Sequence, residues 1–182
     1  MLAVIIMGSP GDEPVARRAS AVLDEFGIPW EMRVASAHKT PGHVLAMLEA
    51  YEADPRPKVY VTIAGRSNAL SGLVDAQVAA PVIACPPYSE AFAGGDVLSS
   101  LRVPSGVAPA VVLEPEAAGL LAAPVFVAGP RWFPFGRRLR RDLRDHRRPL
   151  HNLPPQGIDK VPHAPTVLAP LPPQAHRHPP PP

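Results

Sequence analysis

Polar side chains that could bind an anion or move a proton gather in four short segments of the chain. These segments are GSPGD (8–12), SAHKT (36–40), AGRSNALSG (64–72) and CPPYSE (85–90). Glycines ahead of a helix leave backbone N–H groups free for a phosphate, and Lys39 and Arg66 add positive charge. His38 is the one side chain among them of a type that exchanges protons near neutral pH. The segments predict a site for a small polar ligand with an anionic group, drawn from Ser9, Asp12, Ser36, His38, Lys39, Arg66, Ser67 and Asn68.

Each of these residues also has a purely structural interpretation. Ser9 and Asp12 are of types that commonly cap helices. Asp12 could both cap a helix and accept hydrogen bonds from the hydroxyls of a sugar. Lys39 and Arg66, taken singly, could be solvated surface charges. A lone histidine near a strand end is more often structural than catalytic. A site is favoured because all four segments should converge at one edge of a sheet.

Other reactive residue types are expected to be structural. Cys85 lies between a predicted strand and two prolines, which favours a small buried hydrophobic residue over a nucleophile. His43 follows the start of a predicted helix and is expected at the surface. Regular metal-ligand spacing is missing from the later histidines, so no metal site is expected at His146, His151, His163, His176 and His178.

The elements that must position these segments alternate along the first 130 residues. The continuous apolar run at 2–7 predicts a strand buried on both faces, and further strands are expected at 29–35, 58–64, 81–84 and 110–113. Spacing and capping residues predict helices at 13–26, from 40–41 onward, and at 69–79, 97–101 and 115–126. This alternation implies an α/β fold, a three-layer doubly wound parallel sheet with flavodoxin-like strand order. Ligands bind such sheets outside the carboxyl ends of the strands.

Apolar residues at helical spacing predict which face of each helix is buried. For the first helix they are Val15, Ala19, Val22 and Phe26. For the second helix they are Val44, Met47, Leu48 and Tyr51.

Composition excludes several classes of protein. The chain has 182 residues, 46% hydrophobic and 19% charged, which suits one domain with a sizeable core. A single cysteine excludes a disulfide framework and a multi-cysteine zinc site. No apolar run approaches the ~20 residues of a membrane span, and the first residues lack the basic start of a signal peptide. A cytoplasmic location is the resulting expectation.

Proline and charge divide the chain near Gly129. Residues 1–130 hold 14 of the 27 prolines and a net charge of −5, whereas residues 131–182 hold 13 prolines and a net charge of +7. We therefore expect an α/β domain over residues 1–128 and a basic, Pro/His-rich, disordered tail over residues 129–182. Two hypotheses explain the change, a genuine extension or a frame shift near residue 124. Pro124 falls inside the last predicted helix, where proline costs about 3 kcal/mol.

Five longer motifs carry a resemblance to a known family. They are VIIMGSPGD (4–12), VASAHKTP (34–41), TIAGRSNALSGLVD (62–75), VIACPP (82–87) and SSLRVPSG (99–106). In order and spacing they are similar to the aminoimidazole ribonucleotide carboxylase family of purine biosynthesis. One branch of that family is a mutase of N5-carboxyaminoimidazole ribonucleotide, which typically shows SAHRTP and AGxGGAAHLPG. The other, class II, takes carbon dioxide directly, and SAHK, AGRSN, CPP and SSLR in this chain resemble it.

The resemblance implies a carboxy-lyase reaction, the reversible carboxylation of 5-aminoimidazole ribonucleotide by carbon dioxide to the 4-carboxylate. It implies His38 as the residue that transfers the ring proton, and Ser9 and Asp12 as contacts of the ribose phosphate. The same comparison implies that the nucleotide site is completed by Ser36, Lys39, Gly65, Arg66 and Ser67. No cofactor or metal is implied, and family members form a homo-octamer through a helical segment that follows the core.

Three alternatives remain open. The first is the mutase. The second is a related enzyme that carboxylates a pyridinium nucleotide, against which the compact AGRSN motif argues. The third is an inactive core whose basic stretch, Arg137–Arg148, binds RNA or an acidic membrane surface. Asp142 and Asp145 dilute that stretch and no aromatic residue interrupts it, so we expect neither nucleic acid nor membrane as a partner.

Overall fold

The structure is a computed structural model that describes residues 1–127. All of these residues lie within one compact unit. The tail expected over residues 129–182 lies outside the described residues, with its basic stretch and its histidines. The hypothesis of a frame shift near residue 124 is therefore not tested by the structure beyond residue 127. Among the described helices, none is long and apolar enough to cross a bilayer.

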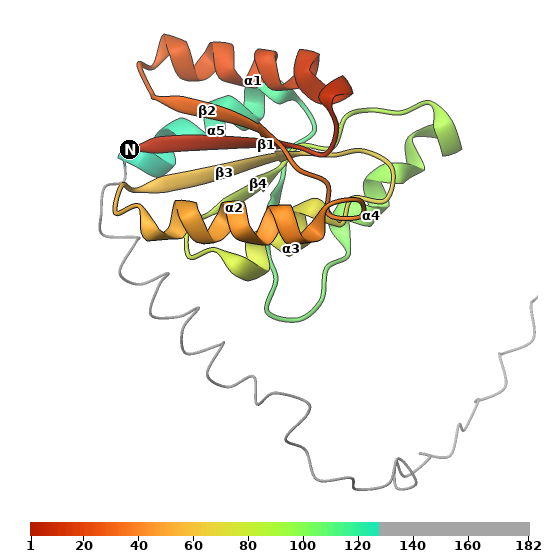
Figure 1. Cartoon of the computed structure of the whole chain (residues 1–182). Helices are drawn as coiled ribbons and strands as arrows, with labels where there is room; N and C mark the ends of the chain where they lie inside the picture. Colours follow the sequence, from red (N-terminus) through yellow and green to blue (C-terminus); the bar gives the residue numbers. More distant parts are fainter. Residues whose placement is uncertain (128–182) are drawn as a thin grey trace, which may run out of the picture. The chain divides into compact units, whose positions relative to one another are not determined.

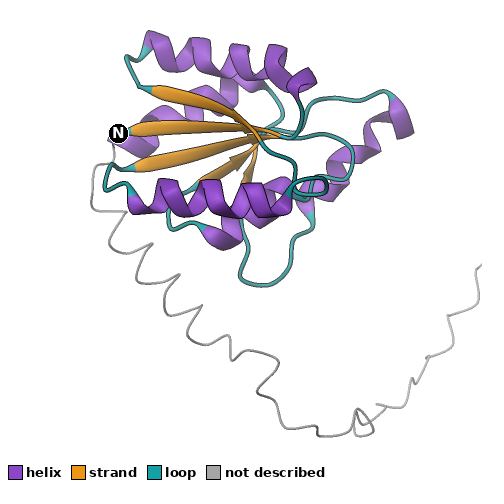
Figure 2. Ribbon diagram, in the orientation of Figure 1, coloured by secondary structure: helices purple, strands orange, loops and turns teal. Residues whose placement is uncertain are grey.

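The centre of the fold is a parallel sheet of five strands in the order β2-β1-β3-β4-β5. The strands are β1 (Leu2–Met7), β2 (Trp30–Val34), β3 (Lys58–Ile63), β4 (Val82–Ala84) and β5 (Ala110–Val111). Every residue of β1, β3 and β4 is buried, because these strands are covered on both faces. The predicted flavodoxin-like order is confirmed, and Figure 2 shows the strands running in one direction with loops leaving their carboxyl ends at one edge.

Helices cover both faces of the sheet, which gives the three layers expected (Figure 1). Alternate residues of β1 point to opposite faces. Ala3, Ile5 and Met7 pack with α1 (Glu13–Glu25) and α5 (Pro115–Val127). Leu2, Val4 and Ile6 pack with α2 (Pro41–Ala53) and α3 (Leu70–Gln77). Shorter segments complete the chain, the 3₁₀ helices η1 (Pro10–Asp12) and η2 (Ala91–Val97) and the single turn α4 (Leu98–Leu101).

The buried face of α1 differs from the face predicted. The structure buries Ala16, Ala19, Ser20 and Leu23, whereas Phe26 is 54% exposed. Phe26 falls outside the buried face because α1 ends at Glu25 and Phe26 is its C-cap residue. Ala19 and Val22 of the predicted face lie against α5, since a Cβ on Gly119 would stand 2.5 Å from the Ala19 carbonyl oxygen and 3.0 Å from the Val22 Cβ. On α2 the prediction was better, since Val44, Leu48 and Tyr51 are buried.

Pro124 lies within α5, three residues before the helix ends at Val127. A proline there removes one N–H···O=C bond of the last turn, and its ring is exposed. The free-energy cost that the sequence analysis assigned to Pro124 therefore does not stop α5 from continuing past this residue. Residues 115–123 pack on the sheet through Ala118, Ala122 and Ala123.

Candidate active site

Three of the four predicted segments leave adjacent strands at the same level. The carbonyl of Met7 at the end of β1 accepts the N–H of Ala35, which follows β2, at 2.9 Å. The carbonyl of Ile63 at the end of β3 accepts the N–H of Gly8 at 2.8 Å. The loops that begin at Gly8, Ala35 and Ala64 therefore start side by side at the carboxyl edge, as predicted from the topology.

The first loop is compact because of Gly8 and the pair Ser9–Asp12. A Cβ on Gly8 would lie 3.1 Å from the Cβ of Ala64, so the loops after β1 and β3 approach as closely as glycine allows. The Asp12 carboxylate accepts the backbone N–H of Ser9 at 2.9 Å and its hydroxyl at 3.2 Å. Asp12 precedes α1 but makes no capping bond to that helix. Its carboxylate instead holds the loop at the point where we expect a ribose phosphate.

The second loop is a turn closed by Ser36 and Thr40. Ser36 Oγ accepts the N–H of Lys39 at 3.2 Å, and Thr40 Oγ1 accepts the N–H of Ser36 at 3.1 Å. The carbonyl of Ser36 accepts the N–H of Thr40 at 2.9 Å. Thr40 and Pro41 take the predicted N-cap and first-turn positions of α2. His38 and Lys39 are both exposed on this turn, at the edge that the other loops share.

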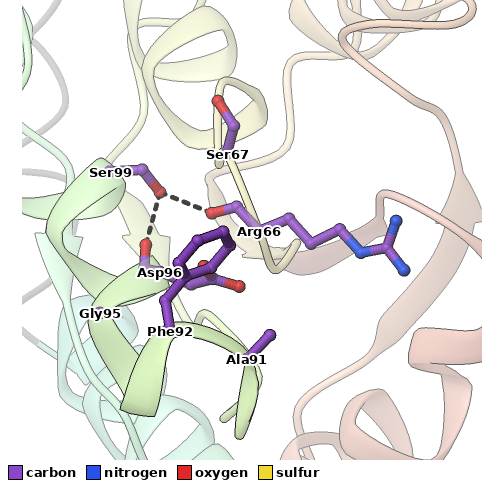
Figure 3. Close-up of a pocket in the computed structure, with 7 residues that line it drawn as sticks. All are labelled: Arg66, Ser67, Ala91, Phe92, Gly95, Asp96 and Ser99. Atoms are coloured by element: carbon purple, nitrogen blue, oxygen red, sulfur yellow. Dashed lines mark hydrogen bonds between the residues drawn. The ribbon is translucent and has the colours of Figure 1, made fainter.

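The third loop borders a pocket of about 560 Å³ (Figure 3). Arg66 in this loop has a φ of 56°, the left-handed region that a residue with a side chain rarely adopts. Such a conformation costs about 1–3 kcal/mol and persists only where the surroundings hold it. The pocket is lined by Arg66, Ser67, Ala91, Phe92, Gly95, Asp96 and Ser99.

Basic side chains of the described residues fall into two groups. Five are in ion pairs with carboxylates: Arg17 with Glu13, Arg18 with Glu114 and Glu116, Arg33 with Glu31, and Arg56 and Lys58 with Asp54. Hydrogen bonds from Arg56 lower the pKa of the Asp54 carboxyl to about 2, and Arg18 likewise lowers the pKa of Glu116. Within residues 1–127, the other three, Lys39, Arg66 and Arg102, have no ion pair or side-chain hydrogen bond.

The placement of these three cations follows the sheet. Lys39 and Arg66 lie in the loops that follow β2 and β3, and Arg102 follows α4. Ser99 of α4 donates to the Arg66 carbonyl at 2.8 Å, which joins α4 to the Arg66 loop. Within residues 1–127, the cations that form no ion pair are therefore associated with the carboxyl edge, where the carboxylates of Asp12 and Asp96 also lie. This is the arrangement that an anionic ligand requires.

Cys85 has the buried structural role that was expected. Its side chain is fully buried after β4 and contacts the carbonyl of Leu113 at 3.8 Å. Burial raises the pKa of the thiol to about 11, with Glu114 contributing in the same direction. The protonated thiol is a poor nucleophile at neutral pH, so the chemistry must lie with other residues.

The structure brings the predicted site residues together in pairs. Hydrogen bonds join Ser9 with Asp12 and Ser36 with Lys39. Arg66 and Ser67 line one pocket. Next to them, Gly65 lies near Pro87, since a Cβ on Gly65 would stand 3.8 Å from it. His38 shares their edge of the sheet. In residues 1–127 no group of three or more His, Cys, Asp or Glu side chains is arranged to hold a metal ion.

Sequence reasoning missed the far wall of the pocket. Phe92 is 87% exposed and, like Ala93, has a left-handed backbone that no simple sequence signal indicates. Asp96 and Ser99 also line the pocket. A signal for Ser99 was present, because it opens the SSLR motif, but no role was assigned to it.

Comparisons with known proteins agree with this geometry. The family model described as AIR carboxylase matches residues 2–133. The chain is 57% identical over 125 residues to a phosphoribosylaminoimidazole carboxylase of Treponema denticola, covering 69% of this chain and 79% of that protein. It is 55% identical over 126 residues to a protein of the same name from Archaeoglobus fulgidus, covering 69% of each.

A solved structure shows the same fold. The crystal structure of Treponema denticola PurE matches with a TM-score of 0.69 and 49% sequence identity, covering 80% of this chain and 92% of that chain. The family match spans most of the chain, and the loops described above fall within it. The chain belongs to the AIR carboxylase family.

Proposed function

We propose that this chain is a phosphoribosylaminoimidazole carboxylase, which adds carbon dioxide reversibly to 5-aminoimidazole ribonucleotide to give the 4-carboxylate. The observation that carries the proposal is the association of Lys39, Arg66 and Arg102, which form no ion pair within residues 1–127, with the carboxyl edge that also bears the Ser9–Asp12 loop and His38. Relatives at 55–57% identity bear the name of this activity. A phosphorylated, carboxylated product supplies the anionic groups that these cations would bind.

The chemistry needs one proton-transfer group and tight positioning. The C4 carbon of the aminoimidazole ring attacks the carbon of carbon dioxide, and a C–C bond forms while one C=O electron pair moves to oxygen. C4 then carries both a hydrogen and the new carboxylate. His38 removes that hydrogen as a proton, the C–H electrons restore the aromatic ring, and the reverse reaction uses the protonated imidazole. Such acid–base assistance contributes about 10²–10⁴-fold, and holding the two reactants in contact supplies much of the rest.

The other residues bind and orient the nucleotide. Ser9 and Asp12 contact its ribose phosphate portion, while Ser36, Lys39, Gly65, Arg66 and Ser67 complete the site. Backbone N–H groups of the glycine-containing loops add hydrogen bonds to anionic oxygens. The proposed reaction requires no cofactor or metal.

A direct assay tests the proposal. Purified full-length protein is mixed with 5-aminoimidazole ribonucleotide and bicarbonate without ATP, and the ultraviolet absorbance of the 4-carboxylate is followed. We expect product to form at a rate that depends on dissolved carbon dioxide. Turnover of only the N5-carboxylated nucleotide would instead assign the mutase. Inactivity together with salt-sensitive RNA binding that disappears on deletion of residues 131–182 would favour the third alternative.

Assembly and location extend the proposal. A homo-octamer is proposed, supported by the resemblance and by the exposed side chains of Leu120 and Leu121 on α5, which are 55% and 38% exposed. Light scattering after gel filtration tests it, and a monomeric mass at micromolar concentration would contradict it. We also propose that residues 1–128 form the catalytic domain and that the enzyme acts in the cytoplasm.

A further inference from the structure

Ser99 lies at a junction between the two walls of the pocket (Figure 3). Its Oγ accepts the backbone N–H of Asn68 at 2.9 Å and lies 2.8 Å from the carbonyl oxygen of Arg66 and 2.7 Å from that of Asp96. A serine hydroxyl has one proton to donate, so the two carbonyls share it. One side chain thus joins three backbone groups from two segments about 30 residues apart in sequence.

The junction closes a turn around Ser67. The Arg66 carbonyl precedes Ser67 and the Asn68 N–H follows it, so Ser99 holds the turn from both ends. This is the turn in which Arg66 has a φ of 56°. A left-handed residue that is not glycine needs such external support. Ser99 provides it from a separate element, α4.

A second contact ties the same turn to α4. The side-chain amide of Asn68 is buried, and its Nδ2 donates to Ser100 Oγ at 2.9 Å. Its Oδ1 accepts the N–H of Ser71 at 3.2 Å. The turn is therefore anchored to α4 on one side and to the start of α3 on the other, and Ser99 is the anchor nearest Arg66.

The direction of the Arg66 side chain depends on this turn. In Figure 3 the guanidinium extends away from Ser99, while the Arg66 carbonyl points toward it. No hydrogen bond or ion pair to another residue of the described part of the chain fixes the guanidinium. The backbone therefore sets where the Arg66 side chain begins and in which direction it leaves the loop, and Ser99 holds that backbone.

We propose that Ser99 is a positioning residue, whose hydroxyl holds the left-handed turn at Arg66 so that Arg66 and Ser67 meet the anionic nucleotide. The inference rests on the proposed function for the identity of the nucleotide. Ser99 acts through Arg66 and forms no bond in the reaction. The competing interpretation is that Ser99 only bonds the Asp96 carbonyl of its own helical segment, as many helix serines do.

A double-mutant cycle separates these interpretations. We measure kcat and KM for 5-aminoimidazole ribonucleotide in full-length Ser99→Ala, Arg66→Ala and the double variant. Ser99→Ala should raise KM about 5–10-fold and change kcat less than about 2-fold, because one hydrogen-bonded anchor of a binding residue is lost. In the Arg66→Ala background the same change should raise KM less than about 2-fold.

Two further variants keep the result specific. Ser99→Thr retains the hydroxyl and should restore KM to within about 2-fold of the parent. Ser89→Ala is the matched control, because among residues 1–127 the Ser89 hydroxyl has one hydrogen bond, from the N–H of Ala91 at 3.2 Å on the same segment. An unchanged KM in Ser99→Ala, or KM effects that multiply fully in the double variant, would overturn the proposal.

A measurement independent of activity tests the turn itself. Amide hydrogen exchange of Asn68, followed by NMR, should be about 10-fold faster in Ser99→Ala than in the parent and unchanged in Ser89→Ala. An unchanged Asn68 rate overturns the inference even in an active enzyme. A parent that neither binds nor carboxylates the nucleotide overturns the proposed function and the ligand role of Arg66, while the exchange rate still decides whether Ser99 holds the turn.

Discussion

Gly119 on α5 lies so close to Ala19 on α1 that a Cβ at position 119 would stand 2.5 Å from the Ala19 carbonyl oxygen. The same Cβ would stand 3.0 Å from the Cβ of Val22. Backbone cannot move aside as a flexible side chain can. The contact therefore fixes how closely the two helices pack over one face of the sheet.

Substitution of Gly119 should destabilise the fold. Gly119→Ala must push α5 from α1, and overpacking of this kind costs about 1–3 kcal/mol. The matched control is Gly42→Ala on α2, where a Cβ meets nothing within 4 Å. Alanine should stabilise that helix by up to about 1 kcal/mol. Urea unfolding measures both, and equal midpoints for Gly119→Ala and the parent would contradict the close contact.

Loss of the His38 imidazole should separate binding from turnover. His38→Asn should bind the nucleotide with nearly parental affinity and lose about 10²–10⁴-fold in kcat, because the ring proton has no acceptor. His43→Asn, at an exposed position in the first turn of α2, provides the control and should retain parental kcat. Steady-state kinetics and calorimetric titration give the two quantities. Parental turnover in His38→Asn would remove His38 from the mechanism.

The two groups of cations should respond differently to removal. Lys39→Ala and Arg66→Ala should each raise KM about 10-fold or more, because each removes a charge-assisted contact with an anion. Arg17→Ala removes an exposed cation already paired with Glu13 and should leave KM within about 2-fold of the parent. Raising ionic strength should weaken nucleotide binding in the parent more than in Arg66→Ala. Equal KM increases in all three variants would refute the distinction.

Cys85 should be unreactive in the folded protein. Because its pKa is raised to about 11, very little thiolate exists at pH 8, and burial also blocks access. A thiol reagent such as iodoacetamide should label native protein at pH 8 far more slowly than protein unfolded in urea. Cys85→Ala should keep parental kcat. Rapid labelling of native protein accompanied by loss of activity would give Cys85 a role that the structure does not support.

The sheet could be predicted from sequence because its signals are local. Apolar runs such as LAVIIM and KVYVTI are long enough to mark β1 and β3, and the loops after them carry the candidate site residues. The carboxyl-edge rule then placed those loops together without any knowledge of distances. The hydrogen bonds between Ser9 and Asp12 were not predicted, although both residues lie in one loop.

Packing between distant segments could not be predicted in the same way. The buried face of α1 includes Ala16 and Ser20, which hydrophobicity did not select, and its contact with α5 brings Ala19 and Val22 against Gly119, almost 100 residues away. The pocket wall that contains Phe92 and Ser99 also depends on contacts between distant segments. Phe92 and Ala93 take left-handed conformations that their residue types do not suggest, and Ser99 acquires its partners from a loop about 30 residues earlier.

The distribution of unpaired cations has a consequence for how substrates arrive. Residues 1–127 carry thirteen acidic and eight basic side chains, so a phosphate ester meets net negative charge on the described part of the chain, where Lys39, Arg66 and Arg102 are the cations that no carboxylate pairs. The electrostatic field of the protein thereby favours encounters in which the phosphate ester faces these cations. Carbon dioxide, which has no charge, crosses the same field unhindered, so one reactant is guided and the other simply diffuses in.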